Sequence, residues 1–173
     1  MDIFVEQLVR RKRKPSDYIK VFLCFAAAFV VIMLMFAFSN VPYVGSLIFL
    51  AAAGLVYLIY NVGISVNLEY EYCFTNGALD VDKIIAARRR KRMTDVNARD
   101  IEIMATTKNR AFSNYMQNSD IKKIYACSSV QDEGVYFVVY TKDSKKMMLL
   151  FNPNETIKDG FRRLNPQKVF LND

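Results

Sequence analysis

The sequence predicts a membrane-anchored protein made of an α-helical hairpin and a small α+β domain. The 48 residues between Lys20 and Glu69 carry no charge, although 24% of the 173 residues are charged. After Glu69, apolar and polar residues alternate in short segments, which is the pattern of half-buried strands. The last part of the chain changes to the spacing of an amphipathic helix.

The uncharged run is too long for one membrane crossing and divides into two. As a single helix it would extend about 70 Å, against about 30 Å for the hydrocarbon core of a bilayer. The group Ser39-Asn40-Val41-Pro42 interrupts it, because proline removes a backbone donor and disfavours helix in the residue before it. We therefore predict transmembrane helices at about residues 21–38 and 43–62.

Basic residues predict the orientation of this hairpin. They precede the first span and are missing from the connecting loop, and basic flanks stay on the cytoplasmic side. Two crossings return the chain to the same side. We therefore expect a cytoplasmic N-terminus over residues 1–17, the hairpin over 18–65 and a cytoplasmic domain over 66–173. The residues expected to set the topology or contact the leaflet are Arg10, Arg11, Lys12, Arg13 and Lys14.

Two interpretations fit the segment before the first span. Ile3, Phe4, Leu8 and Val9 fit one apolar face of a helix over residues 2–13, which would lie in the membrane interface beside anionic headgroups. Alternatively, the segment is a short flank whose charge only sets the topology.

The predicted spans have the character of an anchor. They carry no acid, base or histidine at membrane depth, and those are the groups that proton relays and ion pathways use. Small residues cluster at 26–28 and 51–54, where they allow close helix packing or association with other spans.

A β-hairpin is predicted directly after the anchor. Residues 68–75 alternate with a period of two, the dipeptide Asn76-Gly77 follows, and residues 78–85 alternate again. Asn-Gly is the strongest short hairpin signal, because both central turn positions require a positive φ. Further strands are expected at residues 89–94, 100–104, 121–128, 134–141 and 146–152, with a loop or short helix near 111–118 and a helix from Pro153.

Three stretches of the domain resemble a known family. They are residues 72–81, the basic run at 88–92 and the Asp100-Ile101-Glu102-Ile103 strand. Together they are similar to bacterial PH-like domains, and the likeness covers about residues 66–164. It implies an antiparallel β-barrel of about seven strands with a C-terminal helix. The whole chain also resembles an uncharacterised family of small bacterial two-span membrane proteins. This resemblance implies that the protein is located in the bacterial cytoplasmic membrane.

The basic run is the clearest candidate site of the soluble part. On a strand, Arg89 and Lys91 would point to one side, and the other side would carry Arg88, Arg90 and Arg92. The run could bind the anionic leaflet as a solvated hairpin, form a pocket for an anionic headgroup, set the topology or dock a partner. The candidate ligand-binding residues are Arg88, Arg89, Arg90, Lys91 and Arg92.

We expect no catalytic residues, no metal site and no cofactor. The chain has no histidine, no P-loop and no GxSxG, HExxH or Rossmann glycine pattern. Cys24, Cys73 and Cys127 are widely spaced and are interpreted as reduced structural thiols. Nucleic acid is not an expected partner, because the tethered domain holds only eighteen basic residues against fourteen acids.

The leading hypothesis is a non-enzymatic binding or scaffold module. It would dock a protein partner or anionic lipid headgroups at the cytoplasmic leaflet. The alternative is an accessory subunit of a larger membrane complex, in which the hairpin packs against other spans. A membrane-tethered enzyme of unknown class is the third hypothesis.

Overall fold

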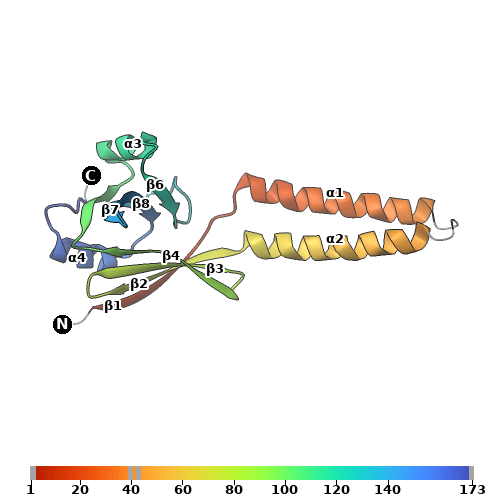
Figure 1. Cartoon of the computed structure of the whole chain (residues 1–173), viewed down its shortest axis with the longest axis horizontal. Helices are drawn as coiled ribbons and strands as arrows, with labels where there is room; N and C mark the ends of the chain where they lie inside the picture. The colour runs from red at the N-terminus through yellow and green to blue at the C-terminus, as the bar shows by residue number, and fades with distance from the viewer. Residues whose placement is uncertain (1–2, 39–40, 42–43, 172–173) are drawn as a thin grey trace. The chain divides into compact units, whose positions relative to one another are not determined.

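A computed structural model of the chain describes residues 3–38, 41 and 44–171. The chain divides into two compact units (Figure 1). One, the helical unit, is Arg13–Asn67, and the other, the β-unit, combines Met1–Lys12 with Leu68–Asp173. The predicted turn at residues 39–42 lies outside the described residues except for Val41.

The first unit consists of two long helices that lie side by side (Figure 1). Helix α1 spans Pro15–Ala37 and α2 spans Val44–Val66, each with 23 residues and a length of about 34 Å. Both contain a stretch long and apolar enough to cross a membrane. Helix α1 begins earlier than predicted, because Pro15 suits the first helical position and the Asp17 carboxylate accepts the Lys14 N–H at 3.0 Å.

The second unit contains two four-stranded sheets and two short helices. The first sheet has the order β1-β2-β3-β4, and the second has the order β5-β7-β8-β6. The strands are β1 (Phe4–Arg10), β2 (Leu68–Thr75), β3 (Ala78–Ile85), β4 (Arg89–Asn97), β5 (Ile101–Thr106), β6 (Lys122–Tyr125), β7 (Tyr136–Lys142) and β8 (Lys145–Phe151). The helices are α3 (Arg110–Gln117) and α4 (Glu155–Leu164).

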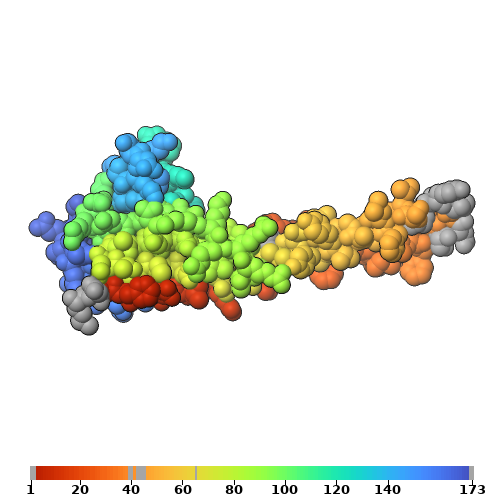
Figure 2. Space-filling model, turned by 60° about the horizontal axis from the view of Figure 1, so that its bottom comes forward, coloured from red at the N-terminus to blue at the C-terminus, as the bar shows by residue number. Residues whose placement is uncertain are grey.

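The N-terminal segment is a strand, so the first of the two interpretations, an interfacial helix over residues 2–13, was wrong. Strand β1 pairs along its whole length with β2, from Phe4 opposite Thr75 to Arg10 opposite Glu69. Val5 and Val9 face the core, whereas Phe4 and its neighbours at every second position are exposed. Figure 2 shows this red segment along one border of the yellow and green strands. The helical hairpin is therefore inserted between two adjacent strands of one sheet.

The described residues form two separate sheets rather than the expected closed barrel, and there are eight strands rather than seven. Strand β6 also departs from the antiparallel expectation, because it pairs in parallel with β8. Strand β7 runs opposite to β6, and the β7–β8 hairpin then reverses the chain again. Strand β8 therefore runs in the same direction as β6. At one end, the Lys12 N–H donates to the Ser128 carbonyl at 2.9 Å and links β1 to the loop that follows β6.

Aromatic side chains fill the space between the sheets and α4. Tyr72 and Phe151 lie with ring centres 5.7 Å apart, and Phe74 and Phe161 lie 5.3 Å apart. Gly160 lets α4 approach this closely, because a β-carbon there would lie 2.4 Å from the Phe74 ring. A second cluster, around the buried Phe137, packs beneath α3. The predicted C-terminal helix thus covers the main core.

Candidate functional site

The basic run forms the end of the β3–β4 hairpin. Its turn places Ala86 and Ala87 at φ values of 52° and 54°, a left-handed conformation that matches the twist of two paired strands. Arg88 completes the turn, and β4 begins at Arg89. The run therefore lies on a regular hairpin, as the sequence predicted.

The register places this hairpin end beside the points where the chain leaves the sheet for the helices. Arg89 pairs with Ile85, and Ile85 pairs with Leu68. Leu68 lies two positions after Val66, the last residue of α2. Adjacent strands lie about 4.8 Å apart, so the Arg89 backbone is about 10 Å from that of Leu68.

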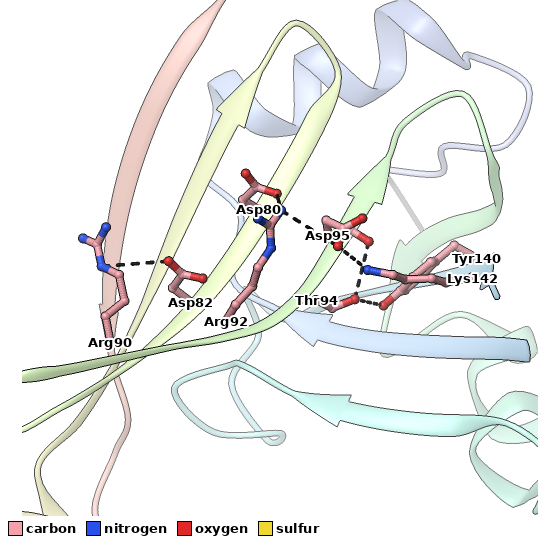
Figure 3. A network of polar contacts seen from close by, with 8 residues as sticks. All are labelled: Asp80, Asp82, Arg90, Arg92, Thr94, Asp95, Tyr140 and Lys142. Carbon is pink, nitrogen blue, oxygen red and sulfur yellow. Dashed lines mark hydrogen bonds and ion pairs between the residues drawn. The ribbon is translucent and has the colours of Figure 1, made fainter.

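Two of the five basic side chains are held by acids on the solvent face of the first sheet. Arg90 lies 2.6 Å from a Glu71 oxygen and 3.9 Å from an Asp82 oxygen. Arg92 forms an ion pair with Asp80 (Figure 3). These arginines therefore balance carboxylates on β2 and β3, and their charge is largely committed within the domain.

The positive charge of Arg92 offsets the repulsion between two carboxylates of the first sheet. Asp80 and Asp95 lie directly opposite each other on β3 and β4, an arrangement that destabilises a sheet when the charges are alike. Arg92 lies between the two, 3.9 Å from an Asp95 oxygen, and Lys142 of β7 forms a second ion pair with Asp95 (Figure 3). The network links the first sheet to the second.

A buried hydrogen bond lies next to this network. The hydroxyl groups of Thr94 and Tyr140 bond to each other between β4 and β7 (Figure 3). Burial raises the pKa of Tyr140, so its hydroxyl stays protonated at neutral pH. This arrangement has the features of a structural link between sheets rather than of a catalytic site.

Arg89 and Lys91 occupy the opposite face of the hairpin, as the alternation predicted. Lys91 pairs with Lys83, which places three positive side chains on that face. Arg89 and Lys91 are exposed, and none of the three forms an ion pair within residues 3–38, 41 and 44–171. Within the basic run, Arg89 and Lys91 thus hold charge that is available to an external anion.

The N-terminal basic residues are divided between the two units. Arg10 forms an ion pair with Glu69 at 2.6 Å, and Lys12 forms one with Asp132 at 2.6 Å. The Lys12 and Ser128 hydrogen bonds lower the pKa of the Asp132 carboxyl. Arg10, Arg11 and Lys12 belong to the β-unit, whereas Arg13 and Lys14 belong to the helical unit. Part of this run therefore has a structural role that the sequence did not reveal.

No metal centre is evident in the described part of the chain, where no three Cys, Asp or Glu side chains cluster as ligands. Sequence reasoning missed the first strand and the acids that pair with the arginines. The alternation of Ile3, Val5 and Val9 was the available signal for the strand. The acid pairing depends on strand register, which the spacing alone did not give.

The family comparison gives a result that agrees with the inclusion of the N-terminal strand in the domain. The model of the family described as Bacterial PH-like domain (DUF6106) matches residues 1–171. The chain belongs to this family. The match of this bacterial PH-like protein covers β1, the helical hairpin and the rest of the sheets together. Neither the curated proteins nor the solved structures contain a match to it. Membership of a PH-like family points to a binding or scaffold module.

Proposed function

We propose that this protein is a non-enzymatic binding module anchored in the bacterial cytoplasmic membrane, whose β3–β4 hairpin contacts anionic lipid headgroups. In this proposal α1 and α2 cross the membrane, and both the N-terminus and the β-unit are cytoplasmic. The apolar character of the two helices supports the anchor, and the basic residues around them support the orientation.

The position of the hairpin in the sheet carries the proposal. Its end lies about two strand spacings, or about 10 Å, from Leu68, where the chain enters the sheet from α2. If α2 crosses the bilayer, its last residues lie at the headgroups, and the hairpin end lies within reach of them. Each Lys or Arg near an anionic surface contributes about 1 kcal/mol to binding, with a decline over one Debye length.

The division of the basic run makes the proposal specific. Arg89, Lys91 and Lys83 share the face without ion pairs to described residues, so we assign the headgroup contact to them. Arg90 and Arg92 instead hold the acids of the sheet. A contact based on net charge alone would not distinguish these two sets of side chains.

The test is co-sedimentation of the β-unit with vesicles. The protein used would join residues 1–12 to residues 68–173 through a short Gly-Ser linker, with its fold checked by circular dichroism. We expect binding to vesicles containing anionic lipid, weaker binding at higher salt and little binding to neutral vesicles. Replacing Arg89 and Lys91 with Gln should weaken binding by about tenfold or more, given about 1 kcal/mol per charge.

The matched control replaces Arg90 and Arg92 with Gln. It removes the same net charge, but from side chains that are already paired with acids. We expect it to retain clearly more binding than the first variant. Equal losses of binding in both variants would mean that the contact depends on net charge and not on Arg89 and Lys91 in particular. An absence of binding by the folded β-unit would refute the leaflet contact.

A further inference from the structure

Strand β1 is the outer strand of the first sheet, and the outward backbone groups of its central part have no strand partner among the described residues. The Ile3 carbonyl accepts the Asn76 N–H at 3.0 Å, and the Arg11 N–H donates to Leu68 at 3.0 Å. In an antiparallel ladder, alternate residues exchange these bonds, so the odd-numbered residues of β1 bond to β2. The N–H and C=O groups of Phe4, Glu6 and Leu8 therefore point away from the sheet.

The other sheet edges are protected in ways that β1 is not. Strand β4 carries consecutive basic residues and a bulge, and β6 has only four residues, two of them lysines. Strand β5 is covered where Met104 bonds to the C-terminal segment at 2.8 Å. Strand β1 has seven regularly paired residues and no Lys or Pro, and Phe4 and Leu8 are each 63% exposed. Natural proteins rarely leave a long regular edge of this kind unprotected.

A groove runs between β1 and α4. It has a volume of about 410 Å³, within the usual range for binding pockets. Its strand side is formed by Ile3, Phe4 and Val5. On the helix side, Asp159 and Arg163 contribute one charge of each sign. A strand added beside β1 would direct alternate side chains into this space.

We propose that β1 binds an extended segment of a partner protein as an added antiparallel strand, with an apolar-basic-apolar pattern opposite Phe4, Glu6 and Leu8. Apolar residues opposite Phe4 and Leu8 cover their exposed side chains, and a Lys or Arg opposite Glu6 meets its carboxylate. The Glu6 carboxylate accepts a hydrogen bond from the Cys73 thiol at 3.5 Å and forms no ion pair with a described residue. The Arg10 guanidinium, by contrast, is already held by Glu69.

This inference is independent of the leaflet contact, because β1 and β4 are opposite edges of the same sheet. A failure at one edge therefore leaves the other proposal intact. The test uses the full chain in detergent micelles, so that the β1–β2 pairing is unchanged. The probe is a fluorescently labelled peptide, Glu-Thr-Val-Thr-Lys-Val-Val, whose residues would lie opposite Arg10 through Phe4 in turn.

Anisotropy titration should show saturable binding of this peptide. N-methylation of its first Val and its Lys removes N–H groups that face β1, and we expect a loss of about tenfold or more. N-methylation of both Thr residues removes N–H groups that face away, and binding should change by less than about threefold. Equal effects of the two modifications, or no binding at all, would overturn the proposal.

A charge exchange locates the peptide on the edge. Glu6→Lys should weaken binding of the Lys peptide by about tenfold. The same variant should bind a peptide that has Glu in place of that Lys. The matched control Asp120→Lys makes the same charge change at an exposed loop position and should leave binding unchanged. An equal loss in both variants would overturn the assignment. Self-association of the chain that Glu6→Lys abolishes would assign this edge to a second copy instead, and would also overturn it.

Discussion

The insertion of the helical hairpin into a sheet predicts that residues 68–173 do not form a fully stable domain by themselves. That fragment lacks β1, which contributes seven paired residues and the partly buried side chains of Val5 and Val9, and it lacks the partly buried Ile3 just before the strand. The Gln7 amide also donates to the Asn152 carbonyl and accepts the Asn154 N–H, both at 2.8 Å.

The cost follows from these contacts. Half-burial of Val5 and Val9 contributes about 1 kcal/mol each, and the two Gln7 hydrogen bonds contribute about 1 kcal/mol each. The sum is about 4 kcal/mol before the backbone ladder is counted. Typical domains are stable by only about 5–15 kcal/mol, so the loss is a large part of the total.

The assay is urea unfolding followed by circular dichroism. It compares residues 68–173 with a chain in which a short Gly-Ser linker replaces residues 13–67. A short linker suffices because Arg10 pairs directly with Glu69 and the Arg11 N–H bonds to Leu68. We expect cooperative unfolding of the joined chain and a midpoint far lower, or no transition, for the fragment. Unfolding free energies within about 1 kcal/mol of each other would refute the reasoning, because β1 would then contribute less than its contacts imply.

Three further predictions concern single positions. Ala87→Gly should stabilise the β-unit by about 1 kcal/mol in urea unfolding, because Ala87 has a φ of 54° and glycine tolerates that region. Burial and the Glu6 carboxylate raise the pKa of Cys73, so alkylation at pH 8, followed by mass spectrometry, should be slower than for an exposed thiol and faster in Glu6→Gln. The pKa of Asp132 is lowered by Lys12 and Ser128, so its contact stabilises fully above the unfolded value and is lost as pH falls through the folded value. Urea unfolding should therefore show Lys12→Gln to be destabilising at pH 7 and neutral once Asp132 is protonated in both states.

Local pattern was enough to predict most of the β-unit. Strands β2 and β3 have the predicted bounds, because Asn76 and Gly77 adopt positive φ values of 49° and 98° and fix the turn between two alternating segments. The C-terminal helix was predicted from apolar spacing, and its Asn154 cap accepts the Ile157 N–H at 2.9 Å. Each of these signals involves residues close together in the sequence.

The features that were missed depend on distant partners. Strand β1 pairs with residues 59 to 71 positions away, and its exposed Phe4 and Leu8, spaced by four, resemble one face of a helix. The parallel pairing of β6 with β8 rests on only four residues. In the candidate site, the alternation of the arginines was predictable, but the pairing of Arg90 with Glu71 follows from the register of three strands.

Each unit by itself brings the two ends of the chain that lead to the other unit close together. Within the sheet, β1 and β2 end with Arg11 and Leu68 bonded to each other. Within the helical unit, Arg13 and Tyr18 line the same cavity as Val66, so the start of α1 lies beside the end of α2. Closing a long flexible loop costs entropy, but a formed helical hairpin has already brought its two ends together. We therefore expect the helical hairpin to promote pairing of β1 with β2. In the chain whose residues 13–67 are replaced by a short Gly-Ser linker, the linker should hold the two strand ends together instead.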